Sequence, residues 1–539
     1  MDFKQNLCAA LSNACGMTAE QIGDMLETPP NPAMGDFALP CFKLAKTFRK
    51  APPAIAAELA RNLGEIEGFS HIETAGGYLN FFTDKSAFAR TVIQRVLSEG
   101  DGYGASTEGS GKNICLDYSS INIAKPFGIH HITTTVLGNS LRRIFDHLGY
   151  KTVSINHLGD WGTQIVAYDK WGDREKIENG NSVRELVALY VKFHEEAEKD
   201  PSLEDEARAA FRRIELHEPH EWELFQWFKT LTLKDVARVY DLLGVTFDSY
   251  NGEAFYEDKM PAVVQELKDK GLTKIDNGMT IVDLSEYDMP PCIILKSDGS
   301  TIYATRDIAA AEYRKNTYDF YKSLYVVAYQ QSLHFRQIFK VLELMGYDWA
   351  KDCVHVSFGM VSMEDMTFST RKGNAVYLED VLNASIEKTL EIIKQKSPNL
   401  ENKQEVARQV GVGALVFGVL YNGRIKDYTF SWEKSLNFDG ETGPYAQYTY
   451  ARACSVMRKA DGFDAENIDF SVLSDKYEPY LISRAVIDIC SCFNKFYYDN
   501  RIMDDDTAVR NARLALTEAA RTAIRTGLFL VGLEAPERM

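Results

Sequence analysis

A turn rich in possible phosphate donors spans residues 124–131, which read Ala-Lys-Pro-Phe-Gly-Ile-His-His. A helix predicted to start there would present free backbone N–H groups and the positive end of its dipole to an anion. The imidazole N–H groups of His130 and His131, and the ammonium of Lys125, could add further donors. Taken alone, the pattern also fits an ordinary capped turn between a strand and a helix.

The adjacent histidines form a poor metal site. Neighbouring helical residues point about 100° apart, so His130 and His131 cannot easily chelate one ion. The sequence has no H-x-x-x-H or H-E-x-x-H pattern, and none of its nine cysteines lies in a C-x-x-C pair. We therefore predict no metal ligands and no zinc site, and we expect the cysteines to be reduced.

Two polar loops downstream have the composition of ligand-binding segments. Residues 155–164, INHLGDWGTQ, follow a predicted strand and contain Gly159 and Asp160. Glycine lets a ligand approach the backbone closely. Residues 369–374, STRKGN, place Arg371 and Lys372 on a Ser/Thr/Gly loop, where the two cations could stabilise a polyphosphate leaving group. Either loop, taken singly, could also be a plain exposed turn.

The elements around these loops predict a parallel α/β unit. NICLDYSS reads as a short apolar strand, residues 132–148 carry apolar side chains three or four positions apart, and YKTVSIN reads as a second strand. This strand–turn–helix–strand order implies a parallel sheet with its ligand site at the carboxyl ends of the strands. We also expect a hairpin around Ser297–Gly299 followed by a helix.

The chain of 539 residues is long enough for two to four domains. Residues 1–108 predict an α+β domain in which HIETAGGYLNFF reads as a strand, and a Gly- and Ser-rich linker covers residues 98–113. Residues 109–385 predict the parallel-sheet domain, with a mostly helical insertion at about 168–290. Residues 386–539 predict an all-α domain.

Charge and hydropathy narrow the class of protein. The net charge of −17 disfavours non-specific nucleic-acid binding by the whole surface but leaves room for a local basic groove. No stretch of about 18 apolar residues is present, so no membrane span is expected. The first residues lack a basic leader followed by an apolar core, so we expect no secretion signal and a cytoplasmic location.

Motifs of all three regions occur in order. They are NPAMGDFALPCFKLAK and GGYLNFF; then LDYSSINIAKPF, INHLGDWGTQ, KSDGSTIYATRDIAAAEYR, YVVAYQQSLHFRQIFKVLELMGY and STRKGN; then SLNFDGETGPYAQYTYARACSVMRK and GLEAPERM. Together they resemble the arginyl-tRNA synthetases, a class I aminoacyl-tRNA synthetase family, nearly end to end. Two short stretches of that family's pattern are missing, after Gln164 and near residues 469–479.

The resemblance implies a fold and an activity. The fold would be a Rossmann-like parallel-sheet catalytic domain with a helical insertion, an α+β N-terminal domain that contacts tRNA, and an all-α anticodon-binding domain. The chain would be a monomeric arginine–tRNA ligase using L-arginine, tRNA(Arg) and ATP with Mg²⁺. The arginine carboxylate would attack the ATP α-phosphate, and the terminal tRNA 2′-hydroxyl would then attack the arginyl-adenylate. Positioning and charge stabilisation would supply most of the catalysis.

Roles follow from the resemblance residue by residue. Asp307, beside Tyr303, would pair with the substrate guanidinium, and Asp117 with Asn122 would hold the α-amino group. The set implied for arginine is Asp117, Asn122, Tyr303, Asp307 and Gln331. The catalytic set is Lys125, His130, His131, Arg371 and Lys372. The set implied for ATP is Gly128, His131, Asn139, Gly159, Asp160, His334, Ser369 and Thr370. The set implied for tRNA is Tyr448, Arg452, Arg458 and Arg501, with Tyr450 and Tyr497 as aromatic candidates that core packing explains equally well.

The phosphate turn departs from the family signature, His-Ile/Val-Gly-His. Gly128 replaces the first histidine, His130 replaces the glycine, and His131 is retained. A side chain at 130 could obstruct the nucleotide, and one phosphate donor is lost. Two interpretations follow. The chain is an active arginine–tRNA ligase with a variant turn, or it is a diverged paralogue with weakened or lost adenylation that binds RNA, regulates, or serves another pathway.

Overall fold

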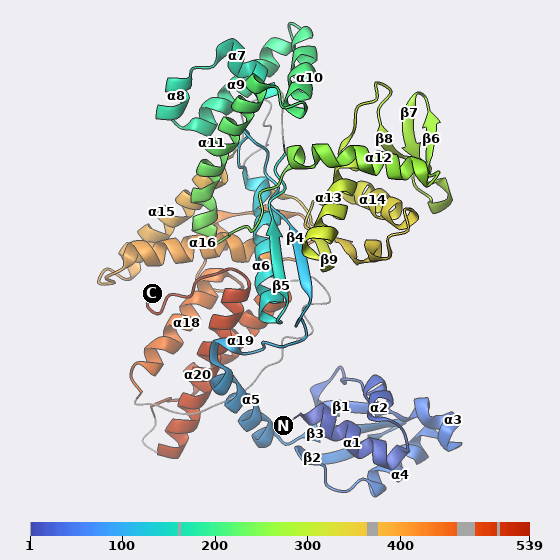
Figure 1. Ribbon diagram of the computed structural model, residues 1–539. Coiled ribbons are helices and arrows are strands. Elements are labelled where there is room, and N and C mark those ends of the chain that lie inside the picture. Colours follow the sequence, from blue (N-terminus) through green and yellow to red (C-terminus); the bar gives the residue numbers. More distant parts are fainter. Residues whose placement is uncertain (1, 160–162, 364–375, 461–479, 504–506) are drawn as a thin grey trace. The chain divides into compact units, whose positions relative to one another are not determined.

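The computed structural model describes residues 2–159, 163–363, 376–460, 480–503 and 507–539 (Figure 1). Described residues of Met1–Tyr103 and Ile502–Thr522 form one compact unit. Those of Gly104–Lys459, Asp469–Arg501 and Ala523–Met539 form the other.

The N-terminal unit is built on a three-stranded antiparallel sheet of order β1-β3-β2. Its elements are α1 (Phe3–Cys15), α2 (Ala19–Met25), β1 (Phe37–Pro40), α3 (Ala45–Phe48), α4 (Pro52–Asn62), β2 (Phe69–Ala75), β3 (Tyr78–Thr83) and α5 (Lys85–Glu99). HIETAGGYLNFF is a hairpin and not the single strand predicted, because the chain reverses at Gly76, whose φ is +57°. The α+β prediction for this region is confirmed.

The second unit contains a parallel sheet of order β10-β9-β4-β5. Its strands are β4 (Asn113–Asp117), β5 (Lys151–Ile155), β9 (Phe320–Tyr325) and β10 (Cys353–His355). The turn η4 (Ile129–His131) and helix α6 (Ile132–His147) connect β4 to β5, which confirms the predicted strand–turn–helix–strand unit. Three further elements carry site residues: α13 (Tyr303–Tyr318), η7 (Tyr329–Gln331) and α14 (Ser332–Leu344).

Alternate residues of β4 face opposite sides of the sheet. Ile114 and Leu116 belong to the core that includes the apolar face of α6, whereas Cys115 packs in a separate cluster with Phe335 of α14. Burial on both faces is the usual condition of a parallel sheet, and it explains the unbroken apolar run in NICL.

The insertion between β5 and β9 has two parts. The first comprises the helices α7 (Thr163–Trp171), α8 (Arg174–Asn179), α9 (Ser182–Ala197), α10 (Ser202–Glu215) and α11 (Pro219–Leu243). The second comprises η5 (Glu253–Lys259), α12 (Met260–Asp269) and an antiparallel sheet of β6 (Thr273–Asp276), β7 (Met279–Val282) and β8 (Cys292–Leu295). The helical prediction holds, but it missed β6 and β7. The hairpin expected around Ser297–Gly299 is present as a bridge between Leu295 and Thr301.

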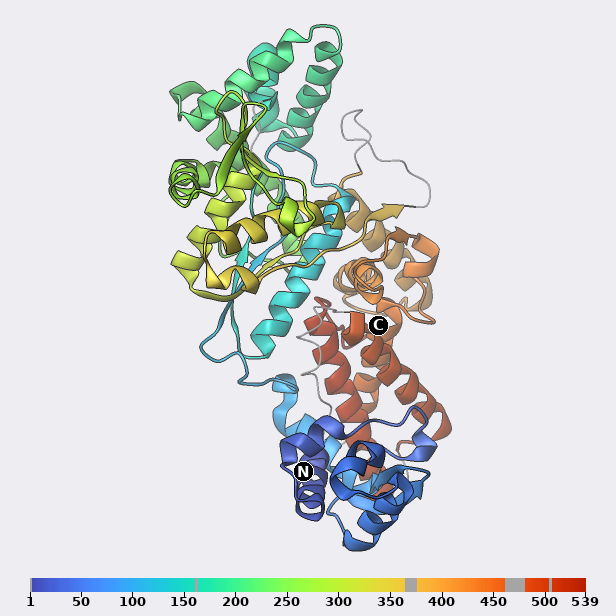
Figure 2. The ribbon, with the colours of Figure 1, turned by 90° about the vertical axis from the view of Figure 1, so that its right-hand side faces the viewer.

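The C-terminal part is largely helical, as predicted. Its helices are α15 (Leu378–Lys396), α16 (Lys403–Tyr421), α17 (Trp432–Ser435), α18 (Gly443–Met457), α19 (Tyr480–Asp499) and α20 (Thr507–Leu530). A short parallel pair, β11 (Val361–Met363) with β12 (Tyr428–Phe430), is the exception. Within the second unit, the helices α7–α10 and the helices α18 and α19 lie at opposite ends of the parallel sheet (Figure 2). Among the described residues, no helix combines the length and apolarity needed to cross a membrane.

Candidate active site

The carboxyl edge of the parallel sheet carries polar side chains on neighbouring strands. Asp117 ends β4, His157 lies two residues past β5, and Tyr325 ends β9. The loop that leaves β4 is strained, because the non-glycine residues Ser119 and Ala124 have φ of +69° and +53°. Such strain persists only where surrounding contacts fix the backbone.

Hydrogen bonds from two helices hold this loop. The buried hydroxyl of Thr134 on α6 accepts from the Ser119 backbone N–H at 3.0 Å and donates to the Val326 carbonyl at 2.7 Å. The hydroxyl of Tyr240 on α11 lies 2.8 Å from Ser119 Oγ and accepts from Asn156 Nδ2 at 2.8 Å. Helix α11 of the insertion is therefore hydrogen-bonded to the loops that follow β4 and β5.

The phosphate turn pairs with a segment far along the chain. The Ile129 N–H donates to the Val376 carbonyl at 3.0 Å, and the Leu378 N–H donates to the Phe127 carbonyl at 2.9 Å. Residues 376–378 directly follow the segment that contains the predicted Ser369, Thr370, Arg371 and Lys372. These four residues, and Asp160, lie outside the described residues. The start of α15 is thus tied to the turn before α6.

The two histidines of the turn lie in contact, with ring centroids 4.0 Å apart and ring planes tilted by 40°. Burial lowers the pKa of His130, and burial together with the neighbouring His130 lowers the pKa of His131 well below its ordinary value. Both imidazoles are therefore neutral near pH 7. They can donate or accept hydrogen bonds there, but they supply no positive charge.

Gly128 and His130 fit one another. A Cβ placed on Gly128 would lie 2.7 Å from Cε1 and 2.8 Å from Nδ1 of the His130 ring. The ring therefore occupies the space that a side chain at 128 would need. The two departures from the family signature therefore compensate for one another. The side chain gained at position 130 fills the space of the side chain lost at position 128.

Three residues of the predicted arginine and ATP sets meet at the start of α13. His334 Nε2 lies 2.7 Å from Asp307 Oδ2, and the ring of Tyr303 stands edge-on to His334 at 5.1 Å. Burial alone would raise the pKa of Asp307, but His334 foremost, with His157 and Arg314, brings it below its ordinary value. Asp307 is therefore a carboxylate at neutral pH, and Tyr303 beside it is exposed.

A buried ion pair lies near Asp307, His334 and Tyr303. Arg314 Nη2 donates to Asp117 Oδ2 at 2.7 Å, and Ser120 Oγ donates to Asp117 Oδ1 at 2.9 Å. Arg314 follows Asp307 by seven positions, so both point from the same side of α13. No sequence motif singled out Arg314. The spacing from Asp307 was the signal that could have identified it.

The other predicted residues are spread around this centre. Asn122 pairs with Gly159 in an isolated parallel bridge. Gln331 is exposed at the end of η7, and Lys125 Nζ lies 5.2 Å from the ring centroid of Tyr190 on α9. Asn139 is buried two turns into α6, on the side that meets Gly532 in the C-terminal segment, so the structure does not bring it to the turn.

Family models match almost the whole chain. Residues 92–432 match tRNA synthetases class I (R), catalytic domain; residues 1–83 match the arginyl tRNA synthetase N terminal domain; residues 470–539 match the DALR anticodon binding domain. The chain belongs to the class I arginyl-tRNA synthetase family. Its fold is a Rossmann-like catalytic domain with a helical insertion, an N-terminal domain and a helical anticodon-binding domain.

Comparison with individual arginyl-tRNA synthetases supports the same family assignment. The chain is 51% identical to the arginine–tRNA ligase of Halothermothrix orenii and 52% identical to that of Clostridioides difficile, with both chains fully covered in each comparison. The first alignment extends over 566 positions, more than the 539 residues of this chain. The arginyl-tRNA synthetase of Thermus thermophilus superposes with a TM-score of 0.81 at 23% identity over 99% of this chain and 100% of its own. That of Plasmodium falciparum superposes with a TM-score of 0.78 at 19% identity over 99% of this chain and 98% of its own.

Helices α18 and α19 of this synthetase carry an exposed cluster of aromatic side chains around one arginine. The guanidinium of Arg452 lies 4.9 Å from the ring centroid of Tyr448, 5.2 Å from that of Tyr497 and 5.4 Å from that of Tyr498. Tyr450 is buried in the core, as its alternative explanation required.

The remaining predicted tRNA residues are Arg501 and Arg458. Arg501 is exposed two residues beyond α19. Arg458 is exposed, and its Nη1 donates to the Glu537 carbonyl at 3.0 Å. Part of its donor capacity is therefore already used by the C-terminal segment.

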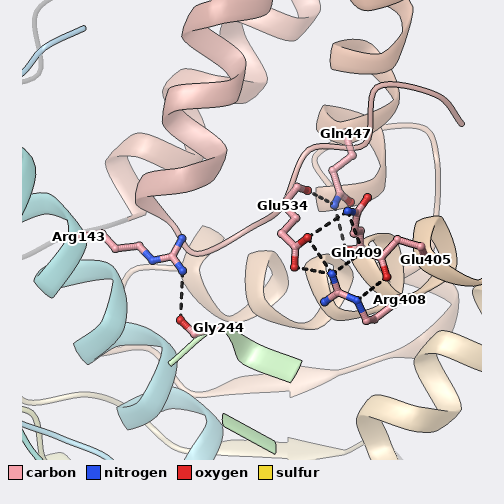
Figure 3. A network of polar contacts seen from close by, with 7 residues as sticks. All are labelled: Arg143, Gly244, Glu405, Arg408, Gln409, Gln447 and Glu534. Carbon is pink, nitrogen blue, oxygen red and sulfur yellow. Dashed lines mark hydrogen bonds and ion pairs between the residues drawn. The ribbon is translucent and has the colours of Figure 1, made fainter. Parts of the chain in front are cut away.

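The C-terminal segment of the synthetase is fixed to two helices (Figure 3). Glu534 accepts from Arg408 at 2.7 and 2.8 Å and from Gln409 at 3.0 Å, and Gln447 Nε2 donates to the Glu534 carbonyl at 2.7 Å. These contacts hold the C-terminal segment GLEAPERM in a defined position against the helices.

One arginine of α6 caps two other helices. Arg143 donates to the Gly244 carbonyl at the end of α11, at 3.2 Å (Figure 3), and to the Phe529 carbonyl near the end of α20, at 2.8 Å. The helix that begins at the phosphate turn is therefore bonded to the insertion and to the last helix of the chain.

Proposed function

We propose that this arginine–tRNA ligase acts as a cytoplasmic monomer, using L-arginine, tRNA(Arg) and ATP with Mg²⁺. The observation that carries this proposal is the family membership, with about 50% identity to curated arginine–tRNA ligases over the full length of both chains. The site is consistent with it, because an ionised carboxylate, Asp307, lies at the same sheet edge as a phosphate turn.

Arginine binding in this proposal depends on two carboxylates. Asp307 pairs with the substrate guanidinium, with the Tyr303 ring beside it, and Asp117 with Asn122 receives the α-ammonium. His334 already hydrogen-bonds Asp307, so the guanidinium either shares that carboxylate with His334 or displaces it. A pocket of this kind rejects neutral amino acids, since they would leave the partly buried Asp307 carboxylate without a guanidinium to pair with.

ATP binding in this proposal uses neutral donors and separate cations. The N-terminus of the 16-residue helix α6 offers its dipole to the phosphates, and His130 and His131 offer imidazole N–H groups. Lys125, with Arg371 and Lys372 of the sequence before Val376, provides the positive charge that the pyrophosphate requires. Mg²⁺ arrives with ATP and further neutralises the phosphates when bound. No proton need leave a protein group for the first step.

Recognition of tRNA is assigned to both ends of the chain. The Arg452 cluster presents three tyrosine faces, and unpaired anticodon bases bind aromatic faces and guanidinium planes by stacking. Domain limits of 1–108, 109–385 and 386–539 accompany this proposal, with the first domain contacting the body of the tRNA.

The second candidate is a paralogue with weakened adenylation, favoured by the loss of the first signature histidine. The fit between Gly128 and His130 argues for the ligase, because the exchange leaves the turn packed and the helix start intact. A turn released from selection for its function would not need to keep such a fit.

Charging of tRNA(Arg) with labelled arginine and ATP separates the two candidates. We expect arginyl-tRNA to form, and ATP–pyrophosphate exchange to depend on arginine and on added tRNA. Asp307→Asn is the control, and it should abolish charging at ordinary arginine concentrations. Absence of arginyl-tRNA with saturating enzyme would contradict the ligase, whereas tight tRNA binding without charging would support the paralogue.

A further inference from the structure

The cation beside the proposed α-amino site is itself deeply buried. The Arg314 side chain is 1% exposed and Asp117 is 9% exposed. Burial alone would lower the pKa of Arg314, but Asp117, Tyr256 and Tyr325 raise it well above its ordinary value, so the guanidinium keeps its charge. A charge this deep is expensive to desolvate, and removing only one member of the pair would leave the other uncompensated.

The surroundings of Arg314 supply little further pairing. Its guanidinium carbon lies 5.2 Å from the ring centroid of Tyr325, and Nη2 lies 3.4 Å from His157 Nδ1. Nε and Nη1 are buried and have no hydrogen-bond partner among the residues that the structure describes. Asp117 is thus the single carboxylate that the described contacts give this guanidinium.

The charges near the pocket fall into two groups, one at the proposed guanidinium end and one at the proposed α-amino end. Asp307 is the anion that the described contacts place at the guanidinium end, where His334 contacts it. At the α-amino end the Asp117 carboxylate is offset by Arg314, which leaves that end without net charge. The corresponding end of arginine, an ammonium next to a carboxylate, also has no net charge. The same end of agmatine, which is arginine without its carboxylate, has one positive charge.

We propose that Arg314 is a positioning and specificity-determining residue of the amino-acid pocket: it fixes the Asp117 carboxylate and offsets its charge, so that the pocket selects arginine over dications that lack the α-carboxylate. The inference rests on the proposed function, which puts the substrate α-amino group at Asp117. Beyond the proposed function, it names the class of ligand that the pocket rejects and the residue that causes the rejection.

Electrostatics gives the direction and scale of the effect. Without the guanidinium, the α-amino end becomes negative in a site of low dielectric constant, and agmatine gains more from that change than zwitterionic arginine. A unit charge a few ångströms away in such a site changes a binding constant by about ten-fold or more. Arg314→Lys keeps the charge and loses the fork geometry, so it should preserve most of the selectivity while weakening both ligands.

The test measures binding of arginine and of agmatine by calorimetry, each with the full chain, for the wild type, Arg314→Gln and Arg314→Lys. We expect the ratio of the two dissociation constants to shift toward agmatine by about ten-fold or more in Arg314→Gln, and by much less in Arg314→Lys. If Arg314→Gln still unfolds cooperatively and its ratio of dissociation constants is unchanged, the proposal is overturned.

Arg306→Gln is a matched control. Arg306 lies on the same helix, is 7% exposed, and pairs with Glu253 and Glu257 away from Asp117. We expect it to lower Tm without moving the arginine-to-agmatine ratio. A ratio shift as large as that of Arg314→Gln would show that general loosening of α13 is the cause, which would also overturn the proposal.

A double-mutant cycle keeps the test valid if Arg314→Gln does not fold. Asp117→Asn leaves a buried, uncompensated cation next to the α-ammonium, whereas Asp117→Asn with Arg314→Gln leaves two neutral groups. We expect the double variant to bind arginine about ten-fold more tightly than Asp117→Asn alone. Equal affinities would contradict the proposal. Because these are binding measurements, they give a result even if the chain proves unable to charge tRNA.

Discussion

The Nε2 of His334 lies 2.7 Å from Oδ2 of Asp307, so the carboxylate proposed for the substrate guanidinium already has a partner from the protein. We expect Asp307→Asn to raise the KM for arginine by about a hundred-fold or more, because the variant loses a charge-assisted, bidentate interaction in a partly buried site. ATP–pyrophosphate exchange, titrated separately with arginine and with ATP, measures the effect. The KM for ATP should stay within about two-fold, and an equal rise in both constants would speak against the assignment.

The exchange at the phosphate turn is testable by reversing it. Gly128→His alone should lower kcat/KM for ATP by about ten-fold or more, because the new Cβ would lie 2.7 Å from the His130 ring. Adding His130→Gly removes the clash and restores the family signature, so the double variant should recover at least the wild-type value. Exchange assays on the wild type, the single variant and the double variant check this, and a single variant as active as wild type would show that the ring moves aside freely.

The buried histidines predict a pH dependence of stability. The pKa of His130 and of His131 is lowered in the folded chain, so below about pH 6.5 the unfolded chain binds protons that the folded chain does not. The stabilising contribution is therefore complete above the unfolded pKa and is lost as the pH falls through and below it. Denaturant unfolding at pH 7 and pH 5 should show a smaller loss in His131→Gln than in the wild type. An equal loss in both would contradict the neutral assignment.

A close approach on α6 predicts an unfavourable alanine substitution. A Cβ on Gly138 would lie 2.2–2.5 Å from the side chain of Tyr118, at the base of the site loop. We expect Gly138→Ala to lower Tm by several degrees although alanine is the better helix former by about 1 kcal/mol. Gly23→Ala in α2 is the control, since its nearest contact would be Cys8 Sγ at 3.7 Å, and it should be neutral or stabilising. Similar melting temperatures for both variants would refute the packing argument.

Local pattern was enough to predict the strand–turn–helix–strand unit and the helical C-terminal part. Apolar periodicity marks α6, and the continuous apolar run in NICL marks a strand buried on both faces. The hairpin β6–β7 was missed although its turn, Asn277-Gly278, has the positive φ values of a hairpin signal, +46° and +80°. The charged residues around it favoured a helical interpretation of the whole insertion.

The site was predictable as a set of residues but not as a set of contacts. Sequence placed Asp117 and Asp307 in one pocket, yet it could not show that Arg314 neutralises the first and His334 contacts the second. Arg314 is one of several charged residues on α13, and only the fold buries it. The backbone pairing of Ile129 with Val376 is likewise invisible, because it joins segments almost 250 positions apart through groups that every residue has.

The packing of His130 over Gly128 also couples the two positions of this turn. Starting from the family's His-Ile-Gly-His, a histidine gained first at 130 would have met a side chain still present at 128. Loss of the side chain at 128 first gives an intermediate with glycine at both positions, which has room for either ring. Glycine at both positions is therefore the one combination that avoids this contact and leaves the turn open to a ring from either side.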